Sequence, residues 1–349
     1  MEVLVTGTDG YIGSQLVPML LARGHQVVGL DAGFYCDGCL YEGIVPAPRS
    51  LRKDIRHISD ADLEGVDAVV HLAELSNDPL GELNPAITYA INHHGTVELA
   101  QRCKRLGITR FVYTSSCSVY GVGSDEYKTE ASLPNPQTAY AECKVLVERD
   151  LQPLADENFS PTFLRNATAY GPSQRMRFDL VLNNLAGLAW TTGEIRMTSD
   201  GTPWRPLVHV RDICTAIACV LDAPRDVVHN QVFNVGNTQE NYRVREIADI
   251  VAQAFPGCQL SVGTAGGDNR SYRVSFDKVY ACLPGFKCQH TVMSGAEELR
   301  DIFTRIQMTS ERFGFRGFTR LKQLQYLLRT DQLNAELFWT TTPTTTSSP

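Results

Sequence analysis

The chain has 349 residues, of which 43% are hydrophobic and 20% charged, and its formal net charge at pH 7 is −7. This length and composition are typical of a globular protein with one large domain or two intertwined lobes. The mild negative charge argues against a general attraction to nucleic acid or anionic membranes, and the sequence has no run of 18 apolar residues that would predict a membrane span.

Ten cysteines are scattered through the chain, and several lie inside apolar patterns. We interpret them as reduced, buried thiols, which favours a cytoplasmic location. Cys36 and Cys39 have the spacing of a zinc-ligand pair, but Cys282 and Cys288 stand six apart and supply no matching second pair, so we expect no metal site. The N-terminus lacks the basic and apolar regions of a signal peptide, which also favours the cytoplasm.

A glycine-rich turn follows the first apolar run of the chain. Residues 3–5 have the character of a buried parallel strand, and a helical pattern that ends near Gly24 begins after the turn. Glycines three residues apart between a strand and a helix permit a tight turn and let the backbone approach a pyrophosphate at the helix N-terminus. The residues of this turn that we expect to contact a dinucleotide are Gly7, Gly10, Tyr11, Ile12 and Gly13.

An acidic residue ends the second predicted strand. Residues 26–30 form that strand, and Asp31 follows 18 residues after Gly13. A carboxylate at this place binds both hydroxyls of the adenosine ribose and repels a 2′-phosphate, and no Arg or Lys follows Asp31 within several residues. We therefore expect NAD rather than NADP. Further along, Asp54 and Ile55 have the form of an adenine contact, with an ordinary loop acid as the alternative.

Strands and helices alternate through the first half of the chain. We expect strands at residues 67–73 and 111–114, a polar loop at 74–79, and one long helix at 85–106. This alternation predicts an α/β fold, a Rossmann doubly wound parallel sheet, with a smaller C-terminal α/β lobe that binds substrate. Ligands of such sheets bind beyond the carboxyl ends of the strands, where Gly7, Ala73 and Ser116 are expected.

The domain limits follow from the same pattern. We assign residues 1–165 to the NAD-binding domain, which the segment 207–237 rejoins, and residues 166–206 and 238–330 to the substrate lobe. Within the last part, residues 320–328 show the pattern of a short amphipathic helix that packs on the body. Residues 340–349 consist of Thr, Ser and Pro, and we expect a disordered tail there.

A tyrosine and a lysine four residues apart are the candidate catalytic pair. Tyr140 and Lys144 lie on a predicted helix, so their side chains share one face about a turn apart. A free phenol has a pKa of about 10 and is a poor base at neutral pH. A nearby fixed cation favours the phenolate, so Lys144 would allow Tyr140 to exchange a proton with a substrate hydroxyl.

These motifs, in this order, resemble the extended short-chain dehydrogenase/reductases of the nucleotide-sugar epimerase/dehydratase kind. The resemblance covers roughly residues 1–300. It implies NAD as the cofactor, a nucleotide-diphosphate sugar as the substrate, and a homodimer that pairs through helices near 85–106 and 139–155. The residues that carry it are Gly7, Gly10, Gly13, Asp31, His71, Leu72, Ala73, Ser116, Val119, Tyr120, Gly121, Tyr140, Lys144, Tyr170, Gly171 and Pro172.

The resemblance also implies roles for individual residues. Tyr140 is the acid and base, Lys144 lowers its pKa and holds the nicotinamide ribose, and Ser116 hydrogen-bonds the reacting hydroxyl. Further cofactor contacts implied in this way are Leu72, Ala73, Asn92 and Thr114.

The residues after Ser116 distinguish the reactions of the family. Its 4,6-dehydratases carry an Asp-Glu pair there, its uronic-acid decarboxylases a Glu at the second place, and its 3,5-epimerising members a Cys at the second place. Here the two places hold Cys117 and Ser118, so the usual acid and base of water loss are missing, and Cys117 stands one residue from the catalytic place, which favours a packing role. The pattern Ser-Ser-x-x-Val-Tyr-Gly is closest to the UDP-galactose 4-epimerase-like group.

The substrate half departs from the family pattern in places. Relatives have Asn three residues after the Arg of the strand at 161–165, where this chain has Thr168, with Asn166 shifted; we expect Ser118 and Thr168 to contact substrate. Asn184 resembles a diphosphate contact, with a helix-surface amide as the alternative. Arg205 resembles the arginine that grips the nucleotide diphosphate, a task that suits its planar charged fork. A second substrate arginine is Arg270 or Arg273, and we prefer Arg270.

We therefore expect an NAD-dependent epimerase that oxidises and re-reduces a sugar hydroxyl, at C4 by the resemblance. A 4-ketoreductase or dehydratase of the same family remains open, because a reducing member shares the whole triad. A non-enzymatic scaffold that senses dinucleotide is the alternative outside enzymes, although such members usually lose the Tyr or the Lys.

Overall fold

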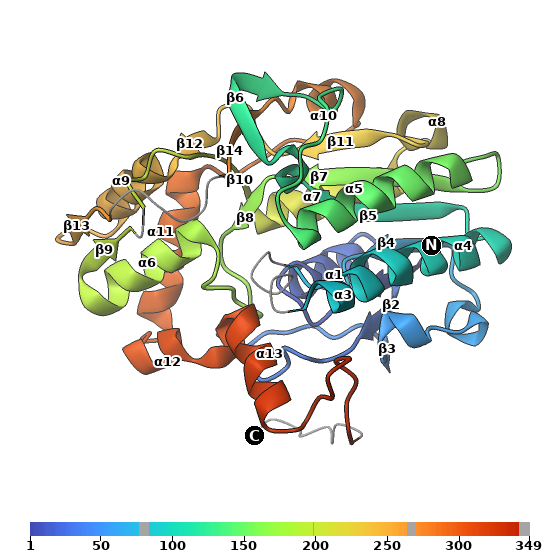
Figure 1. Cartoon of the computed structure of the whole chain (residues 1–349), viewed down its shortest axis with the longest axis horizontal. Helices are drawn as coiled ribbons and strands as arrows, with labels where there is room; N and C mark the ends of the chain where they lie inside the picture. The colour runs from blue at the N-terminus through green and yellow to red at the C-terminus, as the bar shows by residue number, and fades with distance from the viewer. Residues whose placement is uncertain (77–83, 198, 264–269, 342–349) are drawn as a thin grey trace.

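The computed structural model describes residues 1–76, 84–197, 199–263 and 270–341 (Figure 1). Residues 77–79 of the predicted polar loop and residues 342–349 of the predicted tail lie outside these ranges. Thr340, the first residue of the predicted tail, donates its backbone N–H to the carbonyl of Gln332 at 3.0 Å. Thr340 is therefore held by the segment that follows α13.

One parallel sheet of seven strands organises the molecule. Its order is β11-β7-β5-β4-β1-β2-β3, and each neighbouring pair is parallel. The order runs outward in both directions from β1 and β4, so the chain reverses direction across the sheet beside β1, as in a doubly wound fold. The predicted fold class is confirmed. The strands are β1 (Glu2–Thr6), β2 (Gln26–Asp31), β3 (Arg49–Arg52), β4 (Ala68–His71), β5 (Arg110–Ser116), β7 (Ser160–Asn166) and β11 (Val232–Val235).

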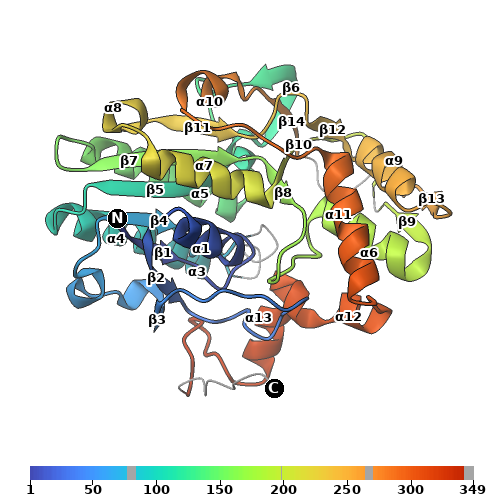
Figure 2. The same cartoon turned by 180° about the vertical axis from the view of Figure 1, so that it is seen from behind.

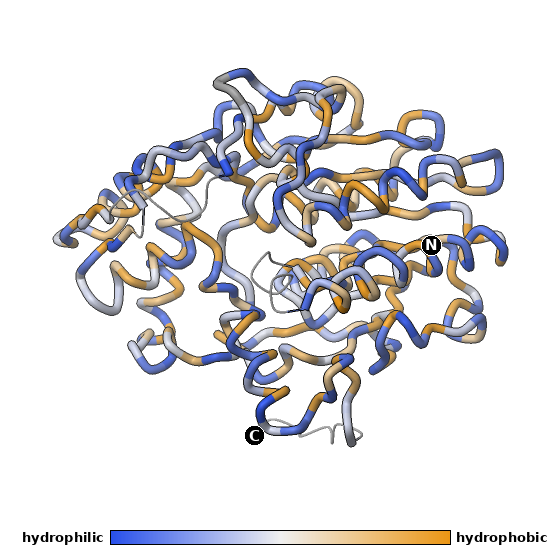
Figure 3. Tube along the Cα trace, in the orientation of Figure 1, coloured by the Kyte–Doolittle hydropathy of each residue, from blue (hydrophilic) through white to orange (hydrophobic). Residues whose placement is uncertain are grey.

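Helices cover both faces of this sheet, because residues along each strand alternate between the faces. In β1, Val3 and Val5 pack into one buried cluster and Leu4 into the other. Figures 1 and 2 show helices α4 (Thr96–Arg105) and α5 (Ala139–Leu151) on one side and α1 (Gly13–Ala22) and α7 (Val210–Asp222) on the other. In Figure 3 hydrophobic stretches follow the central strands. The strands are thus buried on both faces.

The helix predicted over residues 85–106 is interrupted. The chain forms α3 (Pro85–Thr88), then a π-helical segment over Tyr89–Gly95, and then α4. The hydroxyl of Thr96 donates to the carbonyl of Asn92 at 2.8 Å, and the same hydroxyl lies 2.9 Å from Nε2 of His71. A side-chain hydroxyl that bonds to a backbone carbonyl disturbs the regular hydrogen bonds of a helix. The spacing of apolar residues in the sequence does not predict such an interruption.

A second group of elements lies across from the edge of the seven-stranded sheet at which its strands end. A small sheet has the order β12-β10-β8, with β8 (Thr168–Tyr170), β10 (Trp204–His209) and β12 (Asn241–Arg243). Helices α6 (Val181–Thr192), α9 (Val244–Ala254) and α11 (Val292–Arg305) pack beside it (Figure 2). The predicted limits of the two lobes stay a prediction. Strand β10 extends across residue 207, the predicted start of the segment that rejoins the NAD-binding domain. The remaining elements are β6 (Val122–Lys128) paired with β14 (Ser271–Val274), β9 (Glu194–Arg196) paired with β13 (Gln259–Ser261), α8 (Arg225–Val228), α10 (Asp277–Cys282) and α12 (Ser310–Gly314).

The last helix, α13 (Arg320–Arg329), packs as the apolar pattern predicts, with Leu324 and Leu327 buried. It lies beside the segment that follows β2: Gln323 donates to the carbonyl of Phe34 at 3.0 Å, and the indole of Trp339 donates to the carbonyl of Ala32 at 2.7 Å. The C-terminal segment therefore borders the carboxyl end of β2. Among the described helices, none has the length and apolar character that crossing a membrane requires.

Candidate functional site

The carboxyl ends of the parallel strands open into a cavity of about 450 Å³. Most of the predicted site residues line it. The lining residues among those predictions are Gly7, Gly10, Tyr11, Ile12, Gly13, Asp31, Asp54, Ile55, Leu72, Ala73, Thr114, Ser116, Ser118, Tyr140, Lys144, Thr168, Arg205 and Arg270.

The glycine turn after β1 has no room for side chains. Gly7 has a φ of +80°, and a Cβ there would lie 3.0 Å from the backbone of Leu72 and Ala73. A Cβ on Gly13 would lie 2.2 Å from the carbonyl oxygen of Gly7. Glycine is thus required for the left-handed conformation and for the close packing of α1 on the turn. The N-terminus of α1 is left facing the cavity, an arrangement that favours an anion.

Asp31 is held at the end of β2 by backbone donors. Its two carboxylate oxygens accept from the N–H of Asp9 at 2.9 Å and of Gly33 at 2.7 Å. Burial raises the pKa of this carboxyl, and the nearby charge of Asp9 acts in the same direction. Parallel pairing of β2 with β3 also brings Arg52 beside Asp31, although no basic residue is near it in sequence; that guanidinium pairs with Asp9 at 3.0 Å.

The candidate catalytic pair lies at the other end of the cavity. The Thr138 side chain caps α5 by accepting from the N–H of Ala141 at 3.2 Å, and Tyr140 and Lys144 follow on the first two turns. Nζ of Lys144 lies 5.4 Å from the centroid of the Tyr140 ring. Ser116, at the end of β5, accepts from the N–H of Ser118 at 3.1 Å. The three predicted catalytic side chains therefore line the same cavity.

Glu74 is a site residue that the motif did not identify. It lines the cavity, its carboxylate accepts from Nζ of Lys144 and from the hydroxyl of Tyr113 at 2.8 Å, and burial raises its pKa. Lys144 also donates to the carbonyl of Thr114. Glu74 directly follows His71, Leu72 and Ala73 at the end of the strand. This position in the sequence could have identified it as a site residue.

The substrate side carries unsatisfied polar atoms. Within the described part of the chain, Oγ of Ser118 and Oδ1 of Asn166 are buried without a hydrogen-bond partner, and both residues line the cavity. Buried polar atoms are normally paired, so these two atoms indicate ligand contacts. Arg205 donates to the carbonyls of Trp204 at 2.9 Å and of Arg270, and both arginines line the cavity.

Two predicted ligand residues are not among those that line the cavity. The amide of Asn92 exchanges hydrogen bonds with the backbone of Leu75, at 2.8 and 2.9 Å, and so holds the loop after β4. The amide of Asn184 donates to the carbonyl of Phe178 at 3.0 Å. A backbone group therefore satisfies each amide. Their contacts with cofactor and substrate therefore stay predictions, and the observed hydrogen bonds give them no support.

Three charged residues of the lining come from segments without a motif. Arg177 pairs with Asp179 at 2.9 Å and donates to the hydroxyl of Ser76 at 3.2 Å, and Arg320 comes from the first turn of α13. Arg320, Leu324 and Leu327 share one helix face, so the spacing of α13 was a signal that this arginine is buried.

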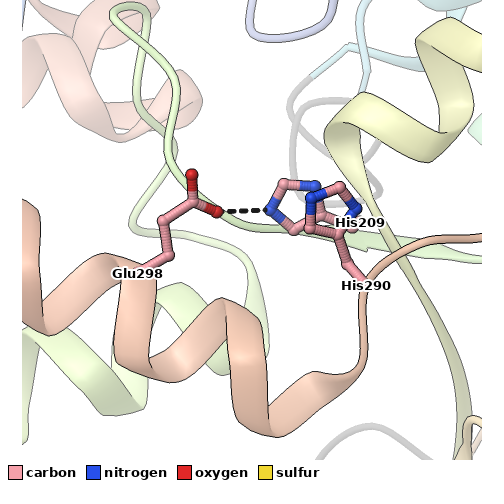
Figure 4. A group of neighbouring side chains, drawn as sticks. All are labelled: His209, His290 and Glu298. Carbon is pink, nitrogen blue, oxygen red and sulfur yellow. Dashed lines mark hydrogen bonds and ion pairs between the residues drawn. The ribbon is translucent and has the colours of Figure 1, made fainter.

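A histidine cluster lies outside the cavity lining (Figure 4). His209, His290 and Glu298 have potential ligand atoms within 4.8 Å of one another. However, Nδ1 of His209 accepts from the N–H of Arg211 at 3.2 Å, which leaves the proton on Nε2, and Nε2 lies 3.1 Å from Glu298. Nδ1 of His290 lies 3.0 Å from the Asp212 carboxylate, so both histidines have hydrogen-bond partners and the cluster gives no support for a bound metal.

The two cysteines with zinc-like spacing have separate partners. Sγ of Cys36 lies 3.4 Å from the Asp9 carboxylate, and Sγ of Cys39 lies 3.2 Å from the carbonyl of Tyr41. Burial raises the pKa of the Cys36 thiol to about 12, which disfavours the thiolate that a metal requires.

Comparison with known proteins gives the chain relatives. It is 32% identical over 271 residues to a UDP-glucose 4-epimerase of Mycolicibacterium smegmatis, an alignment that spans 73% of this chain and 82% of that protein. The structure of MoeE5 in complex with UDP-glucose and NAD is 27% identical, with a TM-score of 0.75 over 88% of this chain and 100% of that one. A Thermus thermophilus UDP-glucose 4-epimerase in complex with NAD is 26% identical, with a TM-score of 0.74 over 87% and 99%.

The profile of one protein family matches residues 3–236, which include the glycine turn, Asp31, Ser116, Tyr140 and Lys144. With the relatives and the geometry of the site, this match leads to one conclusion: the chain belongs to the NAD-dependent epimerase/dehydratase family.

Proposed function

We propose that this protein is an NAD-dependent nucleotide-sugar 4-epimerase, with a UDP-hexose as the substrate to test first. The observation that carries the proposal is the shared cavity: Asp31 and the glycine turn lie at one end, and Tyr140, Lys144 and Ser116 lie at the other. The UDP-glucose named for the similar proteins supports the choice of substrate.

The residues present fit NAD. A Cβ on Gly7 or Gly13 would occupy the turn where the backbone must approach a diphosphate, and Asp31 offers a carboxylate for ribose hydroxyls. Asp54 and Ile55 line the same end, for the adenine. When bound, NAD supplies a hydride acceptor that can return the hydride. Positioning and proton transfer are the tasks of the protein.

Tyr140 takes the proton of the sugar 4-hydroxyl during oxidation and returns it during reduction. Lys144 stands beside the Tyr140 ring and favours the phenolate, while Ser116 orients the hydroxyl that reacts. Arg205 and Arg270 hold the nucleotide diphosphate, so that the sugar can present either face. Ser118, Asn166 and Thr168 line the same wall and contact the sugar.

The position after Ser116 supports epimerisation over water loss. Cys117 is buried, its Sγ lies 3.1 Å from the carbonyl of Arg165, and burial raises the pKa of its thiol well above the usual value. A thiol in this environment is a packing group, not an acid or base. A 4-ketoreductase remains the second candidate, because it would use the same triad.

The test is to mix the purified protein with UDP-glucose or UDP-galactose, follow absorbance near 340 nm, and identify products by NMR. Interconversion of the two sugars without added reductant is the expected result. Stoichiometric consumption of added NADH would identify a reductase instead. A silent spectrum and unchanged UDP-, dTDP-, GDP- and CDP-sugars would contradict an enzymatic function and favour a dinucleotide-sensing scaffold.

We further propose a cytoplasmic homodimer that pairs through the region of α4 and α5, as the family resemblance implies. Light scattering coupled to gel filtration tests the mass. A monomer at micromolar concentration would contradict this part without affecting the proposed reaction.

A further inference from the structure

Arg320 is a buried cation on the wall of the cofactor cavity. It is 2% exposed and lines the cavity, although it belongs to α13, beyond the segment that the family profile matches. Its guanidinium lies 4.1 Å from the centroid of the Tyr35 ring. Among the described residues it forms no ion pair with a carboxylate. An unpaired buried charge is costly, so this arrangement indicates an anionic ligand.

Charges of both signs surround Arg320, but the guanidinium of Arg177 opposes its charge. Burial and the charge of Arg177 lower the pKa of Arg320 to about 10, so it is still a cation at neutral pH. Arg177 is itself buried and is engaged with Asp179. The carboxylates of Asp179 and Asp31 act on Arg320 electrostatically, but among the described residues neither forms an ion pair with its guanidinium, which is free to contact a ligand anion.

The position of Arg320 along the cavity identifies the part of the ligand that it faces. Tyr35 follows β2 and Asp31, at the end that suits the adenosine. Arg177 donates to Ser76, after β4, and interacts electrostatically with Tyr140 at the reacting end. The Arg320 guanidinium contacts the Tyr35 ring and lines the same cavity as Arg177, whose charge acts on it, so we place Arg320 between the two ends. The diphosphate is the part of NAD that joins them, and it carries two negative charges.

We propose that Arg320, delivered by the C-terminal helix α13, binds the diphosphate of NAD from the side opposite the glycine turn. The inference rests on the proposed function only in taking NAD as the cofactor. Hydrogen bonds from Gln323 to Phe34 and from Trp339 to Ala32 fix α13 and its following segment against the chain that holds the adenosine. An arginine is suited to this contact because its fork can donate two hydrogen bonds to phosphate oxygens.

The test compares Arg320→Met with Arg320→Lys and with Arg329→Met, a change of the same kind on the exposed end of α13. Calorimetric titration of the full chain, stripped of nucleotide, measures binding of NAD, ADP, adenosine and UDP. We expect Arg320→Met to weaken NAD and ADP at least tenfold and to leave adenosine and UDP within twofold. Arg320→Lys should recover part of the loss, and Arg329→Met should bind like the unmodified chain.

Thermal unfolding separates this role from a merely structural one. Without nucleotide, Arg320→Met should unfold at or above the temperature of the unmodified chain, because it removes an unpaired buried charge; with NAD its stabilisation should be smaller. Unchanged ADP binding would overturn the proposal, as would equal weakening of adenosine, which would indicate lost packing against Tyr35. Weakening of UDP alone would place Arg320 at the sugar-nucleotide diphosphate and also overturn it. These binding results do not depend on whether any sugar turns over.

Discussion

Nζ of Lys144 donates hydrogen bonds to the carboxylate of Glu74 and to the carbonyl of Thr114. The side chains of Lys144 and Glu74 are buried, with 2% and 4% of their surface exposed. The ammonium in the proposed catalytic cycle is therefore oriented by a carbonyl of β5 and by Glu74, in the segment after β4. A negative charge beside Lys144 also reduces the positive potential that Tyr140 experiences.

The first prediction concerns the pH dependence of turnover. Glu74→Gln keeps a hydrogen-bond acceptor for Lys144 and removes the negative charge. Because less charge then opposes the phenolate, the acidic limb of the kcat/KM profile should move to lower pH, by about one unit. Glu142→Gln is the matched control, since this exposed glutamate lies on the same helix and bonds to Tyr89. Superimposable profiles of Glu74→Gln and the unmodified protein would exclude this role for Glu74.

The second prediction concerns the phenol itself. Tyr140→Phe removes the hydroxyl that we propose exchanges the proton but keeps the ring beside Lys144. Turnover should fall by about 10²- to 10⁴-fold, while the affinity for NAD stays within a few fold. Steady-state rates and NAD titrations measure the two effects, with Tyr89→Phe as the control. Full activity of Tyr140→Phe would remove the mechanism proposed for this site.

Local motifs predicted the ends of the cavity well. Gly7 follows β1, and Asp31 and Ser116 are the last residues of β2 and β5; parallel strands place such residues at one edge of the sheet. The helix with Tyr140 and Lys144 was also readable, because its face is set by spacing within two turns.

The side walls were not predictable in the same way. Asn92 and Asn184 share residue type and approximate place with ligand residues, but backbone groups 17 and six positions away satisfy their amides. Arg52 reaches Asp31 only through the pairing of β2 with β3, and Arg320 reaches the cavity only after α13 docks. Such contacts depend on tertiary packing, and the local patterns of a single sequence do not predict them.

The third prediction concerns a buried ion pair behind the site. Arg165 donates to Glu148 at 2.6 Å, and both side chains are 6% exposed. Arg165→Met would leave the carboxylate buried with less compensation, so the free energy of unfolding should fall by about 3–5 kcal/mol in urea titrations. The double variant Glu148→Leu/Arg165→Met should be less destabilised than Arg165→Met.

A surface pair provides the control for that experiment. Arg196 and Glu194 are joined at 2.6 Å, but their side chains are 70% and 43% exposed. Arg196→Met should therefore cost less than about 1 kcal/mol. Equal losses for Arg165→Met and Arg196→Met would show that burial does not govern these pairs.

The fourth prediction concerns stability in acid. His71 is buried between the hydroxyls of Thr6 and Thr96, and burial lowers its pKa to about 3. The unfolded chain, with a histidine pKa of about 6.5, binds the proton first. The contribution is therefore present above pH 6.5 and is lost as the pH falls from about 6.5 toward about 3, at up to about 1.4 kcal/mol per pH unit.

Urea unfolding between pH 7 and pH 5 measures this slope. The slope should be smaller in His71→Gln, although part of it remains because burial also lowers the pKa of His209. His57 is exposed, so His57→Gln should keep the original slope. A slope that does not change in His71→Gln would assign the acid sensitivity to other groups.

The last prediction concerns recognition of the sugar. Asn166 ends β7, its Oδ1 is buried without a partner among the described residues, and it lines the cavity near the reacting end. A substrate hydroxyl that donates to this oxygen would complete its hydrogen bonding. Asn166→Ala should therefore raise KM for the UDP-sugar about tenfold, the effect of about one hydrogen bond, and leave the NAD affinity nearly unchanged. Asn158→Ala, an exposed amide, is the control. If Thr168→Ala raises KM and Asn166→Ala does not, the substrate contact belongs to Thr168, which stands where relatives have the asparagine. Asn166 would then have only a structural role at the end of β7.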